Sequence, residues 1–311
     1  MTGGRMKKPS AKLLVLSLLT IMLAFVVIAH PLAQQRFETP ISQVPFASIA
    51  VHHEIDDRCP STGRRDNNIY HYAQNAAKNN FTAKGKPVKL SFDDFTNMQK
   101  ATQKKIEMEQ IKFVGKYPAD RTQLTNLIKV KGKSLGEGTL VSLEAYVFRS
   151  FYANTKFSHD DQGRPATGEA VDCDSPELDW NDIHIALSAN PSADTDQCTT
   201  VTAEISPHYR PVVWSKFHDG LNADIENILP GLLQHRVVAQ QKAVDQPLRV
   251  RITGPLFYDA SHKPCEFNGN NVTARNSPER RTIWEIHPIY RIQVYDTARR
   301  RWVELDQWSP T

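Results

Sequence analysis

The feature that most constrains the fold is a change in hydrophobic pattern near residue 136. From Gly136 onward, apolar and polar side chains alternate with a period of two, which is typical of strands that bury one face. Gly254 and Pro255 interrupt the longest of these segments and predict a bend or bulge there. The alternation predicts strands over residues 138–148, 182–187, 201–205, 248–259, 284–288 and 289–295.

The order of these segments predicts a mainly β domain over residues 135–298. A helical stretch at 221–233, interrupted by Pro230, falls between the third strand and the long strand at 248–259. This order matches an OB-like five-stranded Greek-key barrel with an inserted helix. A β-sandwich is the alternative, but it does not need that helix, so we favour the barrel.

A mostly helical and irregular region is predicted over residues 34–134, packing on the barrel. It is polar and rich in Asn, Lys and Gln. Ser91 followed by Asp94 resembles a capping box, and apolar side chains then recur at helical spacing over residues 92–113. We therefore expect one long helix in this region.

Residues 1–29 have the composition of an export signal. Basic residues precede an uncharged, apolar run from Leu13 to Ala29. Val27 and Ala29 suit the −3 and −1 positions of a cleavage site, so we expect a cleaved signal peptide. An uncleaved anchor is the alternative, because a run of about 17 residues is just long enough to span a bilayer. Either way we expect the remaining chain to be extracytoplasmic, periplasmic or secreted, with no further membrane segment.

The composition excludes several classes of protein. Hydrophobic residues make up 40% of the chain, which is enough for a packed core and too much for a disordered protein. The formal net charge is +4, but four basic residues and no acidic ones lie in the export segment, so the rest is close to neutral. A neutral chain offers no global electrostatic argument for binding nucleic acid or a membrane surface.

The four cysteines predict two disulfide bonds, because an exported chain folds in an oxidising compartment. We expect Cys173 to pair with Cys198, since these two bracket one predicted strand. Cys59 would then pair with Cys265 and tie the N-terminal region to the late part of the domain. Zinc coordination is the alternative, but the chain has no Cys-x-x-Cys spacing.

Candidate functional residues are the polar side chains that the alternation places on the faces turned away from the apolar rows. In the second strand, for example, Asp182 and His184 share a face because residues 183, 185 and 187 are apolar. The candidate metal ligands are Asp182, His184, Glu204, His262 and His287. The candidate ligand-binding residues are Arg249, Arg251 and Glu285.

Imidazoles and carboxylates that converge on one point would suit a divalent metal such as zinc or manganese. Arginines beside such an ion would suit a phosphodiester, because guanidinium groups stabilise developing negative charge. The spacing of these residues is common in β proteins, and no metalloprotease, Walker or serine-hydrolase motif accompanies it. The simpler interpretation is a set of solvated or salt-bridged surface residues, so no catalytic residue is assigned.

Two functional hypotheses follow from the predicted barrel. The first is an exported OB-like binding module for an oligomeric ligand, which would be an oligonucleotide, an oligosaccharide or a protein partner. The second is a metal-dependent hydrolase, acting on phosphodiesters. Neither hypothesis requires a cofactor other than the divalent metal.

The C-terminal residues 299–311 are predicted to form a tail. Trp302 and Trp308 lie next to the basic run from Arg299 to Arg301. An exposed aromatic ring beside arginines can hold a base or a sugar ring by stacking and by cation–π attraction. The tail is therefore a further candidate contact surface.

Several blocks of the sequence resemble a group of exported bacterial proteins of unknown function. The resemblance runs over about residues 55–296, implies one continuous domain and implies no activity. Its most specific part is the last block, Trp-Glu-Ile-His-Pro. The blocks are residues 75–81, 182–185, 204–207, 249–262 and 284–288.

Overall fold

The structure of the chain is a computed structural model. All the residues that it describes belong to one compact unit, Pro40–Thr311. The segment 1–29 and the helix expected at 221–233 lie outside the described residues. Within the described part, no helix is both long and apolar enough to cross a membrane. The described residues are 55–60, 62–64, 67–153, 168–191, 197–211, 214–216, 248–265 and 280–308.

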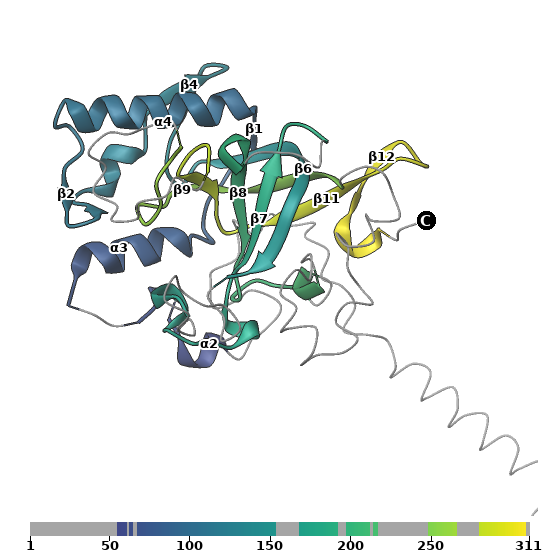
Figure 1. Cartoon of the computed structure of the whole chain (residues 1–311), viewed down its shortest axis with the longest axis horizontal. Coiled ribbons are helices and arrows are strands. Elements are labelled where there is room, and N and C mark those ends of the chain that lie inside the picture. Colours follow the sequence, from purple (N-terminus) through teal and green to yellow (C-terminus); the bar gives the residue numbers. More distant parts are fainter. Residues whose placement is uncertain are drawn as a thin grey trace, which may run out of the picture. The chain divides into compact units, whose positions relative to one another are not determined.

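Five strands of the large sheet close into a barrel (Figure 1). Around the barrel the order is β6-β7-β8-β10-β9, and β9 pairs again with β6. Strands β8 and β10 run parallel to each other, whereas the other neighbours are antiparallel. The predicted mainly β fold with a closed five-stranded barrel is confirmed. The strands are β6 (Leu140–Tyr152), β7 (Ile183–Ser188), β8 (Val201–Ile205), β9 (Arg249–Tyr258) and β10 (Trp284–Ile286).

The apolar row of each strand fills the barrel, as the period-two pattern predicts. Full burial of one large aliphatic side chain contributes about 1.5–3 kcal/mol, so these rows dominate the stability of the barrel. The rows of β7 and β8 lie directly opposite each other and are fully buried: Ile183 with Ile205, Ile185 with Ala203, and Leu187 with Val201.

Three more strands extend the sheet beyond the barrel. β1 (Val88–Leu90) pairs in parallel with β6, β11 (Arg291–Asp296) pairs with β9, and β12 (Arg301–Glu304) pairs with β11. The prediction of a tail is therefore wrong for residues 301–304. The reason is that Val303 is a buried apolar residue in a short alternating segment, and this alternation forms an edge strand.

The N-terminal part contributes the helices α2 (Ile55–Arg58), α3 (Ile69–Lys78) and α4 (Phe92–Glu107). α3 begins after Asn68, whose side-chain oxygen accepts hydrogen bonds from two backbone N–H groups of the first turn. α4 begins with the predicted capping box, in which the Ser91 side chain and the N3 side chain each accept a backbone N–H. Both starts are therefore fixed by local sequence.

α4 ends earlier than the predicted residue 113. Glu109 adopts a left-handed backbone conformation with φ of 57°, which terminates the helix after Met108. Ile111 is buried but lies outside any helix or strand, and the next apolar residues belong to short strands rather than to another helical turn. These strands are β2 (Phe113–Val114), β3 (Tyr117–Pro118), β4 (Ile128–Val130) and β5 (Lys133–Leu135), which pair as two hairpins.

The disulfide bonds join Cys59 to Cys173 and Cys198 to Cys265, so the expected pairing is wrong. Cys173 follows a short 3-10 helix, Ala170–Asp172, which packs against the N-terminal segment rather than against Cys198. Cys198 instead lies near the segment after β9, where backbone bonds join residues 200 and 281. The two disulfides indicate an oxidising, extracytoplasmic environment.

Gly254 lies in β9 where another part of the backbone passes very close. A Cβ atom at this position would lie 2.4 Å from the carbonyl oxygen of Pro288. The position therefore requires glycine, because a side chain would push away the segment that follows β10. That segment carries His287, one of the candidate site residues.

Candidate functional site

The candidate site lies where the C-terminal end of α3 meets the outer face of β7, β8 and β10. His184 and Glu204 are register partners on neighbouring strands, so their side chains leave the barrel on the same side. Ile286 is the partner of Ala203, which places the next residue, His287, beside Glu204. These polar side chains are nevertheless buried, because the N-terminal region packs over this face.

Lys78, the last residue of α3, directs its ammonium group into this buried face. The Lys78 Nζ atom lies 2.5 Å from Glu169 Oε2, 2.8 Å from Asp182 Oδ2 and 3.2 Å from Glu204 Oε2. The three carboxylates come from different parts of the chain, namely the β6–β7 connection, the start of β7 and strand β8. We call Lys78, Glu169, Asp182, His184, Glu204 and His287 the Lys78 cluster.

His287 is oriented by the backbone of α3. Its Nδ1 atom lies 2.5 Å from the carbonyl oxygen of Lys78, which can only accept a hydrogen bond, so Nδ1 carries the proton. Its Nε2 atom therefore faces Asp182 Oδ2 and Glu204 Oε2, each at 3.4 Å. The backbone bond fixes the ring so that Nε2 points into the carboxylates.

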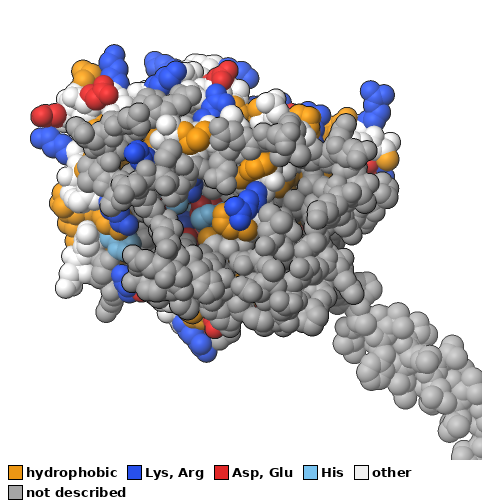
Figure 2. Space-filling view, in the orientation of Figure 1, with side chains coloured by type: hydrophobic (Ala, Val, Ile, Leu, Met, Phe, Trp, Pro, Cys, Tyr) orange, Lys and Arg blue, Asp and Glu red, His pale blue; other side chains and the backbone are white. Residues whose placement is uncertain are grey.

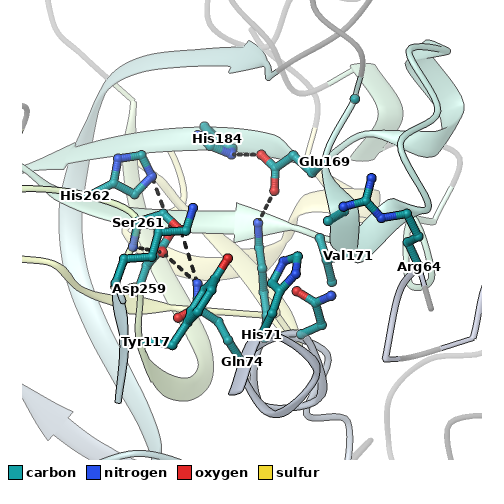
Figure 3. Close-up of a pocket in the computed structure, with 15 residues that line it drawn as sticks. Arg64, His71, Gln74, Tyr117, Glu169, Val171, His184, Asp259, Ser261 and His262 are labelled. Atoms are coloured by element: carbon teal, nitrogen blue, oxygen red, sulfur yellow. Dashed lines mark hydrogen bonds and ion pairs between the residues drawn. The ribbon is translucent and has the colours of Figure 1, made fainter. Parts of the chain in front are cut away.

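His184 occupies the opposite side of the same carboxylates. Its Nε2 atom lies 3.2 Å from Glu204 Oε1 and 3.6 Å from Glu169 Oε1. Unlike His287, this imidazole reaches the pocket described below (Figure 3). His184 is thus the imidazole of the cluster that a bound molecule can reach.

Charge pairing outweighs burial for the central groups of the cluster. Burial disfavours the ammonium form of Lys78, but the charges of Asp182, Glu169 and Glu204 raise its pKa well above the ordinary value. Burial likewise opposes ionisation of Asp182, whereas Lys78 and His287 lower its pKa below the ordinary value. The same competition leaves the pKa of Glu169 at about 2. Lys78 is therefore a fixed cation among ionised acids.

Two further buried acids next to the cluster have raised pKa values, in contrast to Asp182 and Glu169. Burial and the neighbouring charge of Asp182 raise the pKa of Asp172 well above its ordinary value. Burial and the charge of Glu204 likewise raise the pKa of Glu285, although Arg280 Nη1 lies 2.7 Å from Glu285 Oε2. Protonated acids limit the number of negative charges that this part of the protein must hold.

A polar cavity of about 490 Å³ opens beside the cluster, between α3, β7 and the segments that follow β6 and β9. On one wall Glu169 contacts His184, and on the other His262 contacts Asp259 (Figure 3). In Figure 2, acidic and imidazole side chains are visible together near the centre of this face. The Lys78 cluster therefore forms part of the wall of an open pocket.

The wall made by the segment after β9 is also strongly polar. His262 Nε2 lies 3.2 Å from Asp259 Oδ2, and the Gln74 amide of α3 donates a hydrogen bond to Ser261. Burial opposes ionisation of Asp259, but the facing His262 lowers its pKa well below the ordinary value. Asp259 thus adds a second ionised carboxylate to the pocket lining.

A stacked pair of rings lines another part of the pocket. The rings of His71 on α3 and Tyr117 on β3 lie 5.0 Å apart with an interplanar angle of 18°. Lys116 lies over the Tyr117 ring at 5.2 Å. Tyr117 is buried and supports the half-buried His71 ring, which gives the pocket an aromatic surface beside its hydrogen-bonding groups.

The structure brings together Asp182, His184, Glu204 and His287, four of the five predicted metal ligands. His262 lies elsewhere on the pocket wall, where it contacts Asp259. Two groups of three side chains each have donor atoms that lie within 4.8 Å of one another and could hold a metal ion. Metal binding itself stays a prediction. These groups are Glu169 with Asp182 and His184, and Asp182 with Glu204 and His287.

The predicted ligand-binding residues do not form one site. Glu285 is buried against Arg280, whereas Arg249 and Arg251 lie on the outer face of the sheet formed by β6, β9 and β11. There both arginines contact Glu144, and Arg251 lies 4.2 Å from the centre of the Trp302 ring. We call Lys89, Glu144, Arg249, Arg251, Tyr295 and Trp302 the arginine face.

Sequence reasoning missed Lys78 and Glu169, the residues that complete the cluster. Neither lies in a strand, so the period-two argument does not reach them. The apolar pattern of α3 did not mark its buried face, because the buried residues are the polar Gln74, Asn75 and Lys78. A lysine on the covered face of a helix requires acidic partners.

Comparisons with known proteins add no assignment to this geometry. No family profile, curated protein or solved structure matches the chain.

Proposed function

We propose that the protein is an exported, OB-like binding module that holds an oligosaccharide in the pocket beside the Lys78 cluster. The observation that carries the proposal is the composition of the pocket wall. It combines ionised carboxylates, amide and hydroxyl groups with the stacked pair His71 and Tyr117.

The pocket lies on the part of the barrel at which OB barrels bind oligomeric ligands, which supports the proposal. OB barrels bind oligomers on the face of their second and third strands, between the loop joining strands one and two and the loop joining strands four and five. Here the corresponding strands are β7 and β8, which carry His184 and Glu204. The two connections contribute Glu169 after β6, and Asp259 and His262 after β9.

The hydrogen-bonding groups of the pocket wall favour a sugar over a nucleic acid. Carboxylates such as Glu169 and Asp259 accept hydrogen bonds from hydroxyl groups, whereas a phosphodiester has no proton to donate. Lys78, the buried cation, already contacts three carboxylates. A sugar ring can also lie against the half-buried His71 ring, which the buried Tyr117 ring supports from behind, while its hydroxyls reach the acids.

Calorimetric titration with a panel of ligands tests the proposal. The panel contains hexasaccharides of glucose, N-acetylglucosamine and mannose, and a single-stranded dT oligonucleotide, all with EDTA present. We expect a hexasaccharide to bind and His71→Ala to weaken it at least tenfold, which corresponds to about 1.4 kcal/mol. Arg251→Gln is the matched control and should leave the affinity unchanged. Binding of dT alone, or of no member of the panel, would contradict the proposal.

The second candidate function is the metal-dependent hydrolase. The donor atoms that gather in the Lys78 cluster favour it. The separation of Arg249 and Arg251 from the cluster removes the groups that were expected to stabilise a phosphodiester, so the hydrolase ranks second. Its first requirement is a bound metal ion.

A further inference from the structure

We propose that the pocket side of the Lys78 cluster binds one divalent transition-metal ion, zinc or manganese. The ligands are His184 Nε2, one oxygen of Glu169 and one oxygen of Asp182, whose donor atoms lie within 4.8 Å of one another. Lys78 is not displaced but holds the opposite side of the same carboxylates. The proposal does not depend on which ligand the pocket binds.

The two oxygens of each glutamate face different partners. Lys78 Nζ contacts Glu169 Oε2 and Glu204 Oε2, whereas His184 Nε2 faces Glu169 Oε1 and Glu204 Oε1 at 3.6 and 3.2 Å. The carboxylates therefore form a wall with the ammonium on one side and the imidazole on the other. A metal ion between His184 and Glu169 Oε1 leaves the lysine contacts intact.

Buried atoms around this point lack hydrogen-bond partners among the described residues. They are Nε2 of His184, Oε1 of Glu204 and Oδ1 of Asp182. The Asp182 and Glu204 side chains are at most 1% exposed, so water at the surface does not satisfy them. A buried acceptor without a partner is costly, and a metal ion satisfies several at once.

The cluster also places three carboxylates around a single ammonium group, so a second cation has acidic groups to pair with. One imidazole nitrogen with carboxylate oxygens is a donor set that zinc and manganese both accept.

Two groups of donor atoms could hold a metal ion, and the position of Lys78 and of the pocket favours the group with Glu169 and His184. Asp182 Oδ2 and Glu204 Oε2, which face His287, already contact the Lys78 ammonium. The group with Glu169 and His184 instead borders the pocket. An ion there keeps an open coordination position for water or for a ligand hydroxyl.

Metal binding to the purified full chain tests this site directly. After treatment with EDTA and removal of the chelator, the protein is titrated with MnCl2 or ZnCl2 by calorimetry, and elemental analysis gives the stoichiometry. We expect one ion per chain with a dissociation constant below about 10 μM, equivalent to about −7 kcal/mol. Pulsed electron paramagnetic resonance of bound Mn²⁺ should show coupling to one imidazole nitrogen.

Matched variants separate the site from surface binding. His184→Ala should abolish the nitrogen coupling and weaken binding by about 100-fold or more, as should Glu169→Gln. His262→Ala, an imidazole on the same pocket, and Glu144→Gln, a carboxylate of the arginine face, should bind as the unaltered protein does. Absence of stoichiometric binding, or binding that His184→Ala leaves unchanged, would overturn the site. Sugar binding is measured with EDTA present, so either proposal can fail without the other.

Discussion

The Lys78 cluster and the arginine face use the same chemistry in opposite surroundings. In the cluster, one lysine contacts three carboxylates, and its side chain is 7% exposed. On the arginine face, one carboxylate, Glu144, contacts Lys89, Arg249 and Arg251, and the Lys89 side chain is 59% exposed. The first arrangement is anionic and buried, whereas the second is cationic and open to water.

Because the Lys78 cluster is buried and the arginine face is exposed, we propose the cluster as the specific site. Water and salt screen exposed ion pairs, so the arginine face gains little energy from its geometry and tolerates change. Water and salt do not screen buried charges, so these charges must be paired with partners of opposite sign. An acceptor-rich surface that the fold holds rigid can therefore recognise hydroxyl groups or a cation.

The largest expected effect comes from removing the cation of the cluster. Lys78→Met leaves three carboxylates, two of them fully buried, without their ammonium partner, and we expect a loss of about 3–5 kcal/mol in the free energy of unfolding. Lys89→Met is the matched change on the arginine face and should cost less than about 1 kcal/mol. Urea denaturation of both variants measures the difference. Equal losses would show that burial does not distinguish the two regions.

The disulfide beside the cluster should have the next largest effect. Cys59 and Cys173 are 114 residues apart, and the bond holds the segment after Glu169 against the N-terminal region. The double variant Cys59→Ser/Cys173→Ser should lose about 2–4 kcal/mol of stability, because the unfolded chain gains freedom. Thermal unfolding checks this value. We also expect weaker ligand binding, and unchanged affinity would show that the bond does not position Glu169.

The aromatic part of the arginine face should contribute less. Trp302 packs against Tyr295 at 5.3 Å and against the guanidinium of Arg251 at 4.2 Å. We expect Trp302→Ala to lose about 1 kcal/mol, since cation–π contacts at exposed sites are weak. Sugar binding in the pocket should not change. A loss of binding in this variant would move the ligand site to the arginine face.

The smallest expected effect is the pH dependence contributed by Glu144. Burial raises the pKa of Glu144, but hydrogen bonds and charges from Lys89 and Arg251 lower it to about 2. A lowered pKa in the folded state stabilises the protein above the unfolded value, near 4.5, and this contribution disappears as the pH falls toward 2. After screening we expect less than about 1 kcal/mol.

The contribution of Glu144 is measured as the difference in the free energy of unfolding between the unaltered protein and Glu144→Gln. Urea denaturation at pH 6 and at pH 2.5 should show that the variant loses less stability than the unaltered protein between these values. A variant with the same pH dependence as the unaltered protein would show that Glu144 gains nothing from its cations.

The sequence predicted those parts of the site that regular strands carry. Alternation along residues 182–187 and 201–205 correctly placed His184 and Glu204 on one outer face, because the side-chain direction in a strand follows from position alone. Lys78 and Glu169 could not be placed in this way. Their position depends on how α3 and the β6–β7 connection pack on the barrel, which no local pattern encodes.

The prediction of the disulfide pairing was wrong for the same reason, because it also depends on long-range packing. Cys173 and Cys198 are close in sequence, but the segments that carry them pack in different directions: one toward Cys59 and the other toward Cys265. Strand β12 was missed because its alternating segment, residues 301–304, is short and strongly basic at its start. Long-range packing thus limited the prediction more than secondary structure did.

The most direct test of the central claim is to locate a bound hexasaccharide by nuclear magnetic resonance. Resonances of the histidine rings and of the Trp302 indole report on the pocket and on the arginine face in the same spectrum. We predict that saturating ligand shifts the signals of His71 and His184 and leaves Trp302 unchanged. A shift of Trp302 with unchanged histidine signals would contradict the account.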